Sequence, residues 1–132
     1  MNKHIEKAIQ LRNATPMVNN CSQTILRVYA EKLGLDENLA AGIAGNFGGG
    51  MKCGSTCGAI TAGFMILGAK GIESPFAVNE FRRRIAEKHD GMTDCAELLR
   101  ANAQKGGAKK PHCDNMIFEA IELIDELTKE AE

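Results

Sequence analysis

Apolar residues recur at intervals of three and four along almost the whole of this 132-residue sequence. That spacing matches the 3.6-residue turn of an α-helix, and the alternation of apolar and polar residues that is typical of a strand does not occur. We therefore predict an all-α fold. The expected architecture is a single compact bundle of about six or seven helices, forming one domain over residues 1–132, with a glycine-rich loop before the fourth helix.

Proline, glycine and polar capping residues mark where each helix begins and ends. Asn19 or Asn20 can cap the second helix and Gly34 can end it, while Ser74 before Pro75 is typical of a helix start. The expected helices cover residues 5–12, 20–33, 37–44, 53 or 55 to 69, 75–89, 95 onward, and 113 or 114 to 129. In the fifth helix we expect the apolar side chains Phe76, Phe81 and Ile85 to face inward.

The glycine-dense stretch 45–50 interrupts the helical pattern, because each glycine in a helix interior costs about 1 kcal/mol. A phosphate-binding loop is a competing interpretation, but the preceding strand and the usual glycine motifs are missing. We interpret these glycines as allowing positive φ and close backbone approach beside Cys53 and Cys57. Small residues then continue along one side of the next helix, where another helix or a cofactor can come close: Gly58, Ala59, Ala62 and Gly63.

The charge balance excludes one large class of partners. Sixteen Lys and Arg residues oppose seventeen Asp and Glu residues, so there is no basic field to attract nucleic acid. The most apolar stretch, residues 59–69, is too short to enter and span a bilayer, and no signal peptide is visible at the N-terminus. We expect a cytoplasmic protein, and the small-residue helix faces favour a homodimer.

Five cysteines are an odd number, which excludes a fully paired disulfide framework. In the cytoplasm thiols stay reduced unless they turn over or bind metal. All five are predicted near helix N-termini, where the helix dipole and unpaired N–H groups stabilise a thiolate. The thiolate is the form that attacks disulfides and binds metals, so the sequence predicts a chemical role for these residues: Cys21, Cys53, Cys57, Cys95 and Cys113.

The closest pair is Cys53 and Cys57, four residues apart. On a helix that spacing holds the Cβ atoms about 5–6 Å apart, whereas a disulfide needs about 3.5–4.5 Å. A disulfide becomes feasible if Gly54 lets Cys53 lie in the loop, and a metal tolerates the wider spacing. Cys53 and Cys57 are thus the expected catalytic pair of a dithiol mechanism. His112, next to Cys113, is interpreted as a solvated loop histidine, and the alternative is that it lowers the pKa of that thiol or serves as a ligand.

Several segments together resemble a known family. They are Cys21-Ser-Gln-Thr-Ile-Leu, Gly45-Asn-Phe-Gly-Gly-Gly-Met, Cys57-Gly-Ala-Ile-Thr, Asp94-Cys95 and His112-Cys113. Over about residues 20–127 the sequence resembles the C_GCAxxG_C_C family of small redox-active proteins, although Ala62 stands where the motif has glycine. By this match Cys53 is an extra cysteine, and the family's own cysteines are Cys21, Cys57, Cys95 and Cys113.

The resemblance implies a redox protein with an unidentified redox partner. A similar region of the split-Soret cytochromes is associated with an iron–sulfur centre, so the four family cysteines would hold such a cluster for electron transfer or would cycle between dithiol and disulfide. Cys-x-x-Cys-His is missing, so no c-type haem is expected. The alternative is a zinc-binding module without redox turnover, since four thiolates suit tetrahedral zinc equally well. In both metal-binding versions the ligands would be Cys21, Cys57, Cys95 and Cys113.

Overall fold

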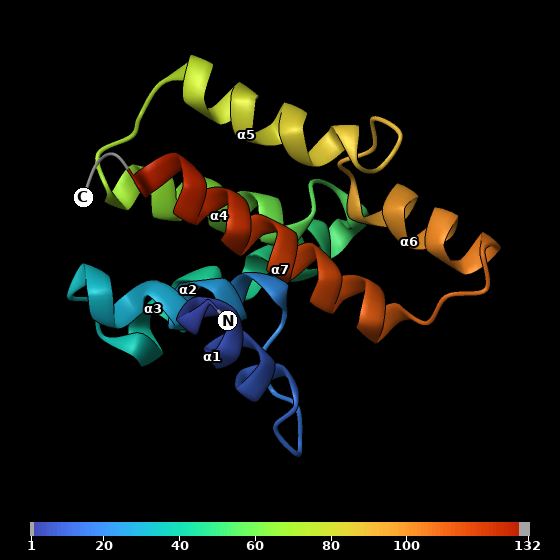
Figure 1. Ribbon diagram of the computed structural model, residues 1–132. Helices are drawn as coiled ribbons and strands as arrows, with labels where there is room; N and C mark the ends of the chain where they lie inside the picture. The colour runs from blue at the N-terminus through green and yellow to red at the C-terminus, as the bar shows by residue number, and fades with distance from the viewer. Residues whose placement is uncertain (1, 130–132) are drawn as a thin grey trace.

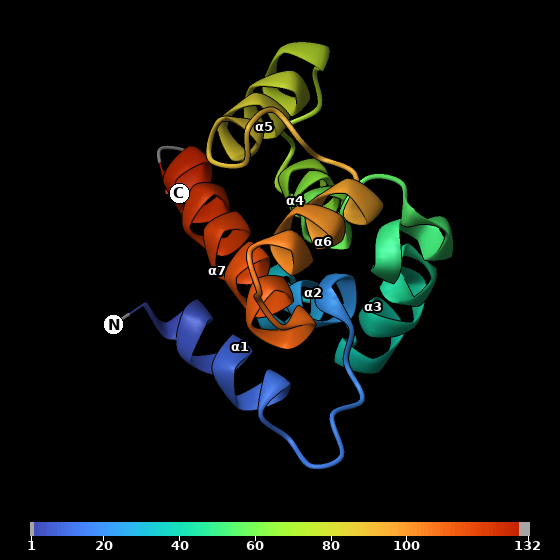
Figure 2. The same ribbon diagram turned by 90° about the vertical axis from the view of Figure 1, so that its right-hand side faces the viewer.

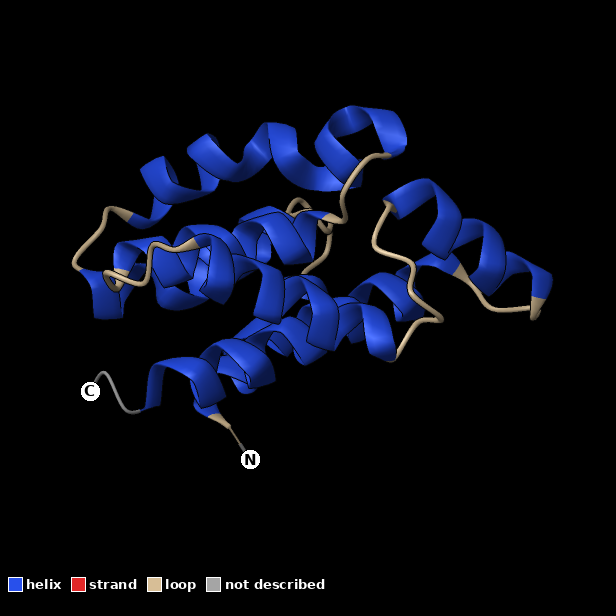
Figure 3. Ribbon diagram, turned by 90° about the horizontal axis from the view of Figure 1, so that it is seen from above, coloured by secondary structure: helices blue, strands red, loops and turns tan. Residues whose placement is uncertain are grey.

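The computed structural model describes residues 2–129, and within that range it contains seven α-helices and no strand (Figures 1 and 3). The prediction of an all-α fold with about seven helices is confirmed. The helices are α1 (Lys3–Arg12), α2 (Cys21–Leu33), α3 (Glu37–Ala44), α4 (Gly58–Ala69), α5 (Pro75–Glu87), α6 (Cys95–Gln104) and α7 (Lys109–Thr128). None of the helices in the described part of the chain is long and apolar enough to cross a membrane.

Helices α2, α4 and α7 pack against one another and form the centre of the fold. Figure 2 shows α1 and α3 flanking α2, while α5 covers α4 and α7. Helix α6 packs against α7 at one end of the molecule (Figures 1 and 3). The largest fully buried side chains come mainly from the three central helices and α5, and include Ile25, Tyr29, Ile60, Ile66, Phe81, Ile117 and Ile121.

The local signals for helix ends are confirmed where they depend on neighbouring residues alone. The Asn20 side chain accepts a hydrogen bond from the Gln23 backbone, and the Gln23 side chain accepts one from the Asn20 backbone, which makes a capping box at the start of α2. Gly34 ends that helix in the left-handed conformation, with φ 70°. The Ser74 side chain caps α5, whose first residue is Pro75.

Two predicted helix starts are wrong. Helix α4 begins at Gly58 instead of residue 53 or 55, because Gly54 adopts positive φ (76°) and Ser55 and Cys57 have non-helical ψ (−150° and 134°). Helix α7 begins at Lys109, before Pro111, instead of at residue 113 or 114. Proline is accommodated there because the backbone N–H groups of the first helical turn have no partner within the helix.

The inward orientation predicted for Phe76 is also wrong, since its side chain is 80% exposed. Phe81 and Ile85 are four residues apart, lie on the same helix face and are buried as expected. Phe76 precedes Phe81 by five residues, which at about 100° per residue turns it about 140° away from that face.

Small residues let α5 approach α4 closely. A Cβ atom built on Gly63 would lie only 2.4 Å from Cζ of Phe81, whose ring is fully buried. Gly68, on the same helix, has nothing within 4 Å of such an atom. The expectation that α4 presents a thin face to another helix is therefore confirmed at Gly63.

This contrast predicts opposite effects of two alanine substitutions in α4. Gly63→Ala is expected to lower the free energy of unfolding by about 1–2 kcal/mol, because overpacking against the buried Phe81 ring outweighs the gain in helix propensity. Gly68→Ala is expected to raise it by up to about 1 kcal/mol. Urea unfolding followed by circular dichroism measures both, and equal stabilities of the two variants would contradict the packing argument.

Candidate functional site

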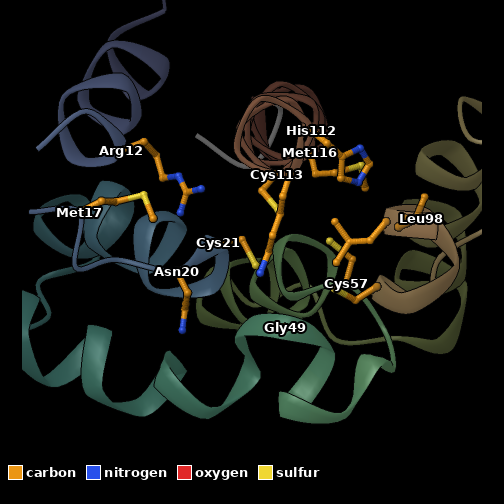
Figure 4. A pocket seen from close by; sticks show the side chains of 13 residues that line it. Arg12, Met17, Asn20, Cys21, Gly49, Cys57, Leu98, His112, Cys113 and Met116 are labelled. Atoms are coloured by element: carbon orange, nitrogen blue, oxygen red, sulfur yellow. The ribbon is translucent and has the colours of Figure 1, made fainter. Parts of the chain in front are cut away.

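Four of the five cysteines line one cavity of about 150 Å³. Figure 4 shows Cys21 from α2, Cys57 from the start of α4 and Cys113 from α7 around this space, with Arg12 from α1 at its edge. Cys95, the first residue of α6, also lines the cavity. The structure thus brings together side chains that are up to 92 positions apart in the sequence, from Cys21 to Cys113.

Backbone hydrogen bonds between two loops bring Cys57 and Cys95 to the same cavity. The Cys57 N–H donates to the Thr93 carbonyl (2.9 Å), and the Cys95 N–H donates to the Ser55 carbonyl (2.6 Å). Between them, Thr56 and Asp94 form an isolated antiparallel bridge. The segment before α4 is therefore held alongside the segment before α6, and both helices begin at the cavity.

Glycines make the close approach of these segments feasible. A Cβ atom on Gly58 would lie 2.5 Å from the Cys21 sulfur, so only glycine lets the start of α4 come this near to α2. Gly50 has φ 63°, and a Cβ atom there would lie 2.3 Å from the Ser55 carbonyl oxygen and 2.9 Å from Cβ of Cys95. The predicted role of the glycine-dense stretch in positive φ and close backbone approach is confirmed at Gly50, where the neighbours are Ser55 and Cys95 instead of Cys53 and Cys57.

Cys21 and Cys57 share a hydrogen bond. The Cys57 thiol donates to the Cys21 sulfur, and this bond, together with the N–H groups of Gly49 and Ser22 and the positive charge of Arg12, outweighs burial and lowers the pKa of Cys21 to about 6. The same hydrogen bond and burial raise the pKa of Cys57 well above its usual range. At neutral pH the pair therefore holds a thiolate on Cys21 and a proton on Cys57.

The other two cysteines of the cavity are neutral thiols at pH 7. Burial raises the pKa of Cys95 and of Cys113, and the negative charge of Cys21 raises both further. Lys109 acts in the opposite direction on both thiols. Cys21 is thus the thiolate of the site, and the remaining thiols surround it.

The predicted position at a helix N-terminus holds for three cysteines. Cys21 and Cys95 are the first residues of α2 and α6, and Cys57 is the N-cap of α4. Cys113 lies in the second turn of α7, because that helix starts four or five residues earlier than predicted. Cys53 precedes α4, is exposed outside the cavity, and its thiol donates to the Gly50 carbonyl (3.5 Å).

Arg12 is a site residue that the sequence reasoning did not identify. Its side chain is only 4% exposed, with Nε donating to Asp114 (2.6 Å) and Nη1 donating to the Asn19 carbonyl (2.7 Å). These bonds hold its guanidinium next to the cysteine cavity (Figure 4). The available signal was its position: Arg12 continues the apolar stripe of Ile5, Ala8 and Ile9, where a cation is unusual.

Among residues 2–129, no group of three or more His, Cys, Asp and Glu side chains stands in an arrangement that could hold a metal ion. The four cysteines do supply the donor atoms that a zinc ion or an iron–sulfur cluster uses, and they surround one space. The chemistry of the donor atoms suits such a group, but among the described residues the thiols are not arranged as its ligands.

The family model described as "Putative redox-active protein (C_GCAxxG_C_C)" matches residues 19–127, a range that contains all five cysteines and the whole cysteine cavity except Arg12 and Met17. The chain belongs to the C_GCAxxG_C_C family. Neither the curated proteins nor the solved structures contain a match to the sequence. The family assignment agrees with a fold that gathers four thiols around one cavity.

In this C_GCAxxG_C_C protein, His112 is not a solvated loop residue. It lies in α7 and lines the cavity, and its ring centre is 6.4 Å from that of His89. Burial, followed by the charge of His89, lowers the pKa of His112. The earlier start of α7 explains the error, because it moves His112 from a loop onto a packed helix.

The low pKa of Cys21 predicts how this family member reacts with iodoacetamide. Its thiolate fraction is about a tenth at pH 5 and about nine-tenths at pH 7, so the alkylation rate of Cys21 should rise about ten-fold over this range and then level off. Cys95 and Cys113 should react more slowly, since their pKa values are raised. Peptide-resolved mass spectrometry measures each site.

The variant Cys57→Ala is the control, because it removes the hydrogen bond that contributes most to the low pKa of Cys21. Its midpoint for Cys21 alkylation should lie at higher pH than in the unmodified protein. A Cys21 rate that still rises ten-fold per pH unit above pH 7 in the unmodified protein would contradict the assignment.

Proposed function

We propose that this protein performs thiol–disulfide exchange, with Cys21 as the nucleophile and Cys57 as the resolving thiol. The observation that carries the proposal is that Cys21 and Cys57 line one cavity, where the start of α4 packs so closely on Cys21 that a Cβ atom on Gly58 would lie 2.5 Å from its sulfur. The interaction between the two thiols lowers the pKa of Cys21 and raises that of Cys57. Cys21 is partly exposed and Cys57 is only 6% exposed, as suits an attacking and a resolving residue. The cytoplasm, where thiols stay reduced, is the proposed compartment.

The reaction follows the usual course of exchange. The Cys21 thiolate attacks one sulfur of a substrate disulfide, and the S–S bond breaks as the other half leaves with the electron pair and takes up a proton. Cys57 then loses its proton and attacks the Cys21 sulfur of the mixed disulfide, which releases the second half as a thiol. The protein pair loses two electrons and the one proton that Cys57 carries, and the substrate disulfide gains the two electrons, with one proton from Cys57 and one from water.

The structure supplies a reason for Cys57 to become reactive only in the second step. Its pKa is raised first by the hydrogen bond to the Cys21 sulfur, then by burial, and then by the charge on that sulfur. Once Cys21 is part of a mixed disulfide, its charge is gone and its sulfur is a poorer acceptor. The pKa of Cys57 then falls because both contributions from Cys21 are lost, while burial still raises it and the N–H of Ala59 still lowers it.

Serine variants test this assignment with bis(2-hydroxyethyl) disulfide as the substrate at pH 7. Cys21→Ser should slow exchange at least about ten-fold, because neutral thiols are only a few per cent ionised at this pH. Cys57→Ser should stop at a mixed disulfide on Cys21. The matched control Cys53→Ser should react like the unmodified protein, and its oxidised form should contain a Cys21–Cys57 disulfide by peptide mapping.

The sequence analysis favoured Cys53 and Cys57 as the catalytic pair, and the same experiment separates the two pairings. Unchanged exchange in Cys21→Ser together with loss in Cys53→Ser would contradict the proposal and favour the pairing based on spacing. Circular dichroism of each variant shows whether a lost rate reflects lost folding.

The second candidate function is metal binding by the four family cysteines, either as an iron–sulfur cluster for electron transfer or as zinc. It is favoured by the convergence of these four thiols, from α2, α6, α7 and the start of α4, on one cavity. Cys21, Cys57, Cys95 and Cys113 would be the ligands, and a bound cluster would supply one-electron transfer. The thiols would lose their protons on binding, and Arg12 and Lys109 would offset part of the negative charge.

Anaerobic purification with iron, sulfide and zinc analysis tests this second candidate. Near-equal iron and sulfide with broad visible absorption would support a cluster, and one zinc per chain without colour would support the zinc site. Either metal should be lost in Cys95→Ser and retained in Cys53→Ser, whose thiol lies outside the cavity. Metal-free protein that still performs exchange through Cys21 would contradict metal binding and leave the dithiol function.

A further inference from the structure

The charges around the cavity all have one sign apart from the thiolate itself. Among the described residues that line it, none is Asp or Glu, whereas Arg12 and Lys109 both are lining residues. Asp114, which does not line the cavity, is paired with Arg12 (2.6 Å) and with Lys110 (2.8 Å), so this acid contacts two cations. One Cys21 thiolate is therefore opposed by an excess of positive charge.

The rest of the lining is mainly apolar and the space is small. Leu98 and Met116 are buried in the cavity wall, and Met17 and Leu99 extend it. The volume of about 150 Å³ is below the range of about 300–1,000 Å³ that is typical of pockets for drug-sized ligands. A space of this size admits a short, thin molecule.

Resting on the proposed thiol–disulfide exchange, we propose that the substrate is a small disulfide whose arms are short and end in carboxylates. The two-carbon arms would lie against Leu98 and Met116, and a carboxylate would lie near Arg12 and Lys109. The sulfur between them would then face Cys21, which forms the new S–S bond as the substrate S–S bond breaks and the leaving half departs as a thiolate that takes up a proton.

Three disulfides with the same –CH₂–CH₂–S–S–CH₂–CH₂– frame test this substrate class. They are 3,3′-dithiodipropionate, bis(2-hydroxyethyl) disulfide and cystamine, which carry carboxylate, hydroxyl and ammonium ends. The measured quantity is the rate of mixed-disulfide formation on Cys21 in Cys53→Ser/Cys57→Ser, where the reaction stops after one step. Each rate is divided by that of 2-mercaptoethanol, because a free thiolate repels the dianion and attracts the dication.

The expected result is a relative rate for the dianion at least ten-fold above that for the dication, with the neutral disulfide between them. Adding Lys109→Gln should lower the dianion rate about two- to five-fold and leave the neutral disulfide unchanged. Lys105→Gln is the matched control, since Lys105 is exposed at the end of α6 and does not line the cavity. Lys109 is exposed as well, so its substitution leaves the core intact.

Equal relative rates for the three disulfides, with the mixed disulfide still formed on Cys21, would overturn the substrate class and leave the proposed function standing. An equal effect of Lys109→Gln and Lys105→Gln would also overturn it, because the cavity would then have no part in the preference. Failure of all three disulfides to react at Cys21 would overturn both proposals.

Discussion

The close approach of the start of α4 to the Cys21 sulfur is the constraint on which the site depends. Gly58 permits it, since any Cβ atom at this position would lie 2.5 Å from that sulfur. The approach places Cys57, the N-cap of α4, within hydrogen-bonding reach of Cys21. The loop before α4 is in turn bonded to the loop before α6, which brings Cys95 to the same cavity.

A partly buried thiolate requires compensation, because burial alone would favour the neutral thiol. Here the compensation comes from several directions: the Cys57 thiol, the N–H groups of Gly49 and Ser22, and Arg12. Arg12 is itself paired with Asp114 of α7, so residues from α1, α2 and α7 together determine the charge balance of the cavity. The same groups that stabilise the thiolate also connect the helices that form the cavity wall.

The helix ends could be predicted from the sequence wherever the residues that determine them lie within one short segment. The Asn20 capping box, the left-handed Gly34 and Ser74 before Pro75 each depend on residues within a few positions. The wrong predictions concern helix ends and side-chain orientations that depend on how the helices pack. Nothing local shows that α7 continues back through Pro111 to Lys109, and the apolar character of Phe76 does not reveal that its helix face is exposed.

The sequence by itself determined that the chain is helical, that its glycine-rich stretch breaks the helices, and that its family cysteines stand apart from Cys53. Periodicity, capping and composition are local properties, and they suffice for the first two conclusions, whereas the third rests on the resemblance to the family. Only the tertiary structure decided that Cys57 lies against Cys21 and that Arg12 faces the thiols. Those contacts join α2 to α4 and α1 to α7, and contacts between segments distant in the sequence are set by how the helices pack.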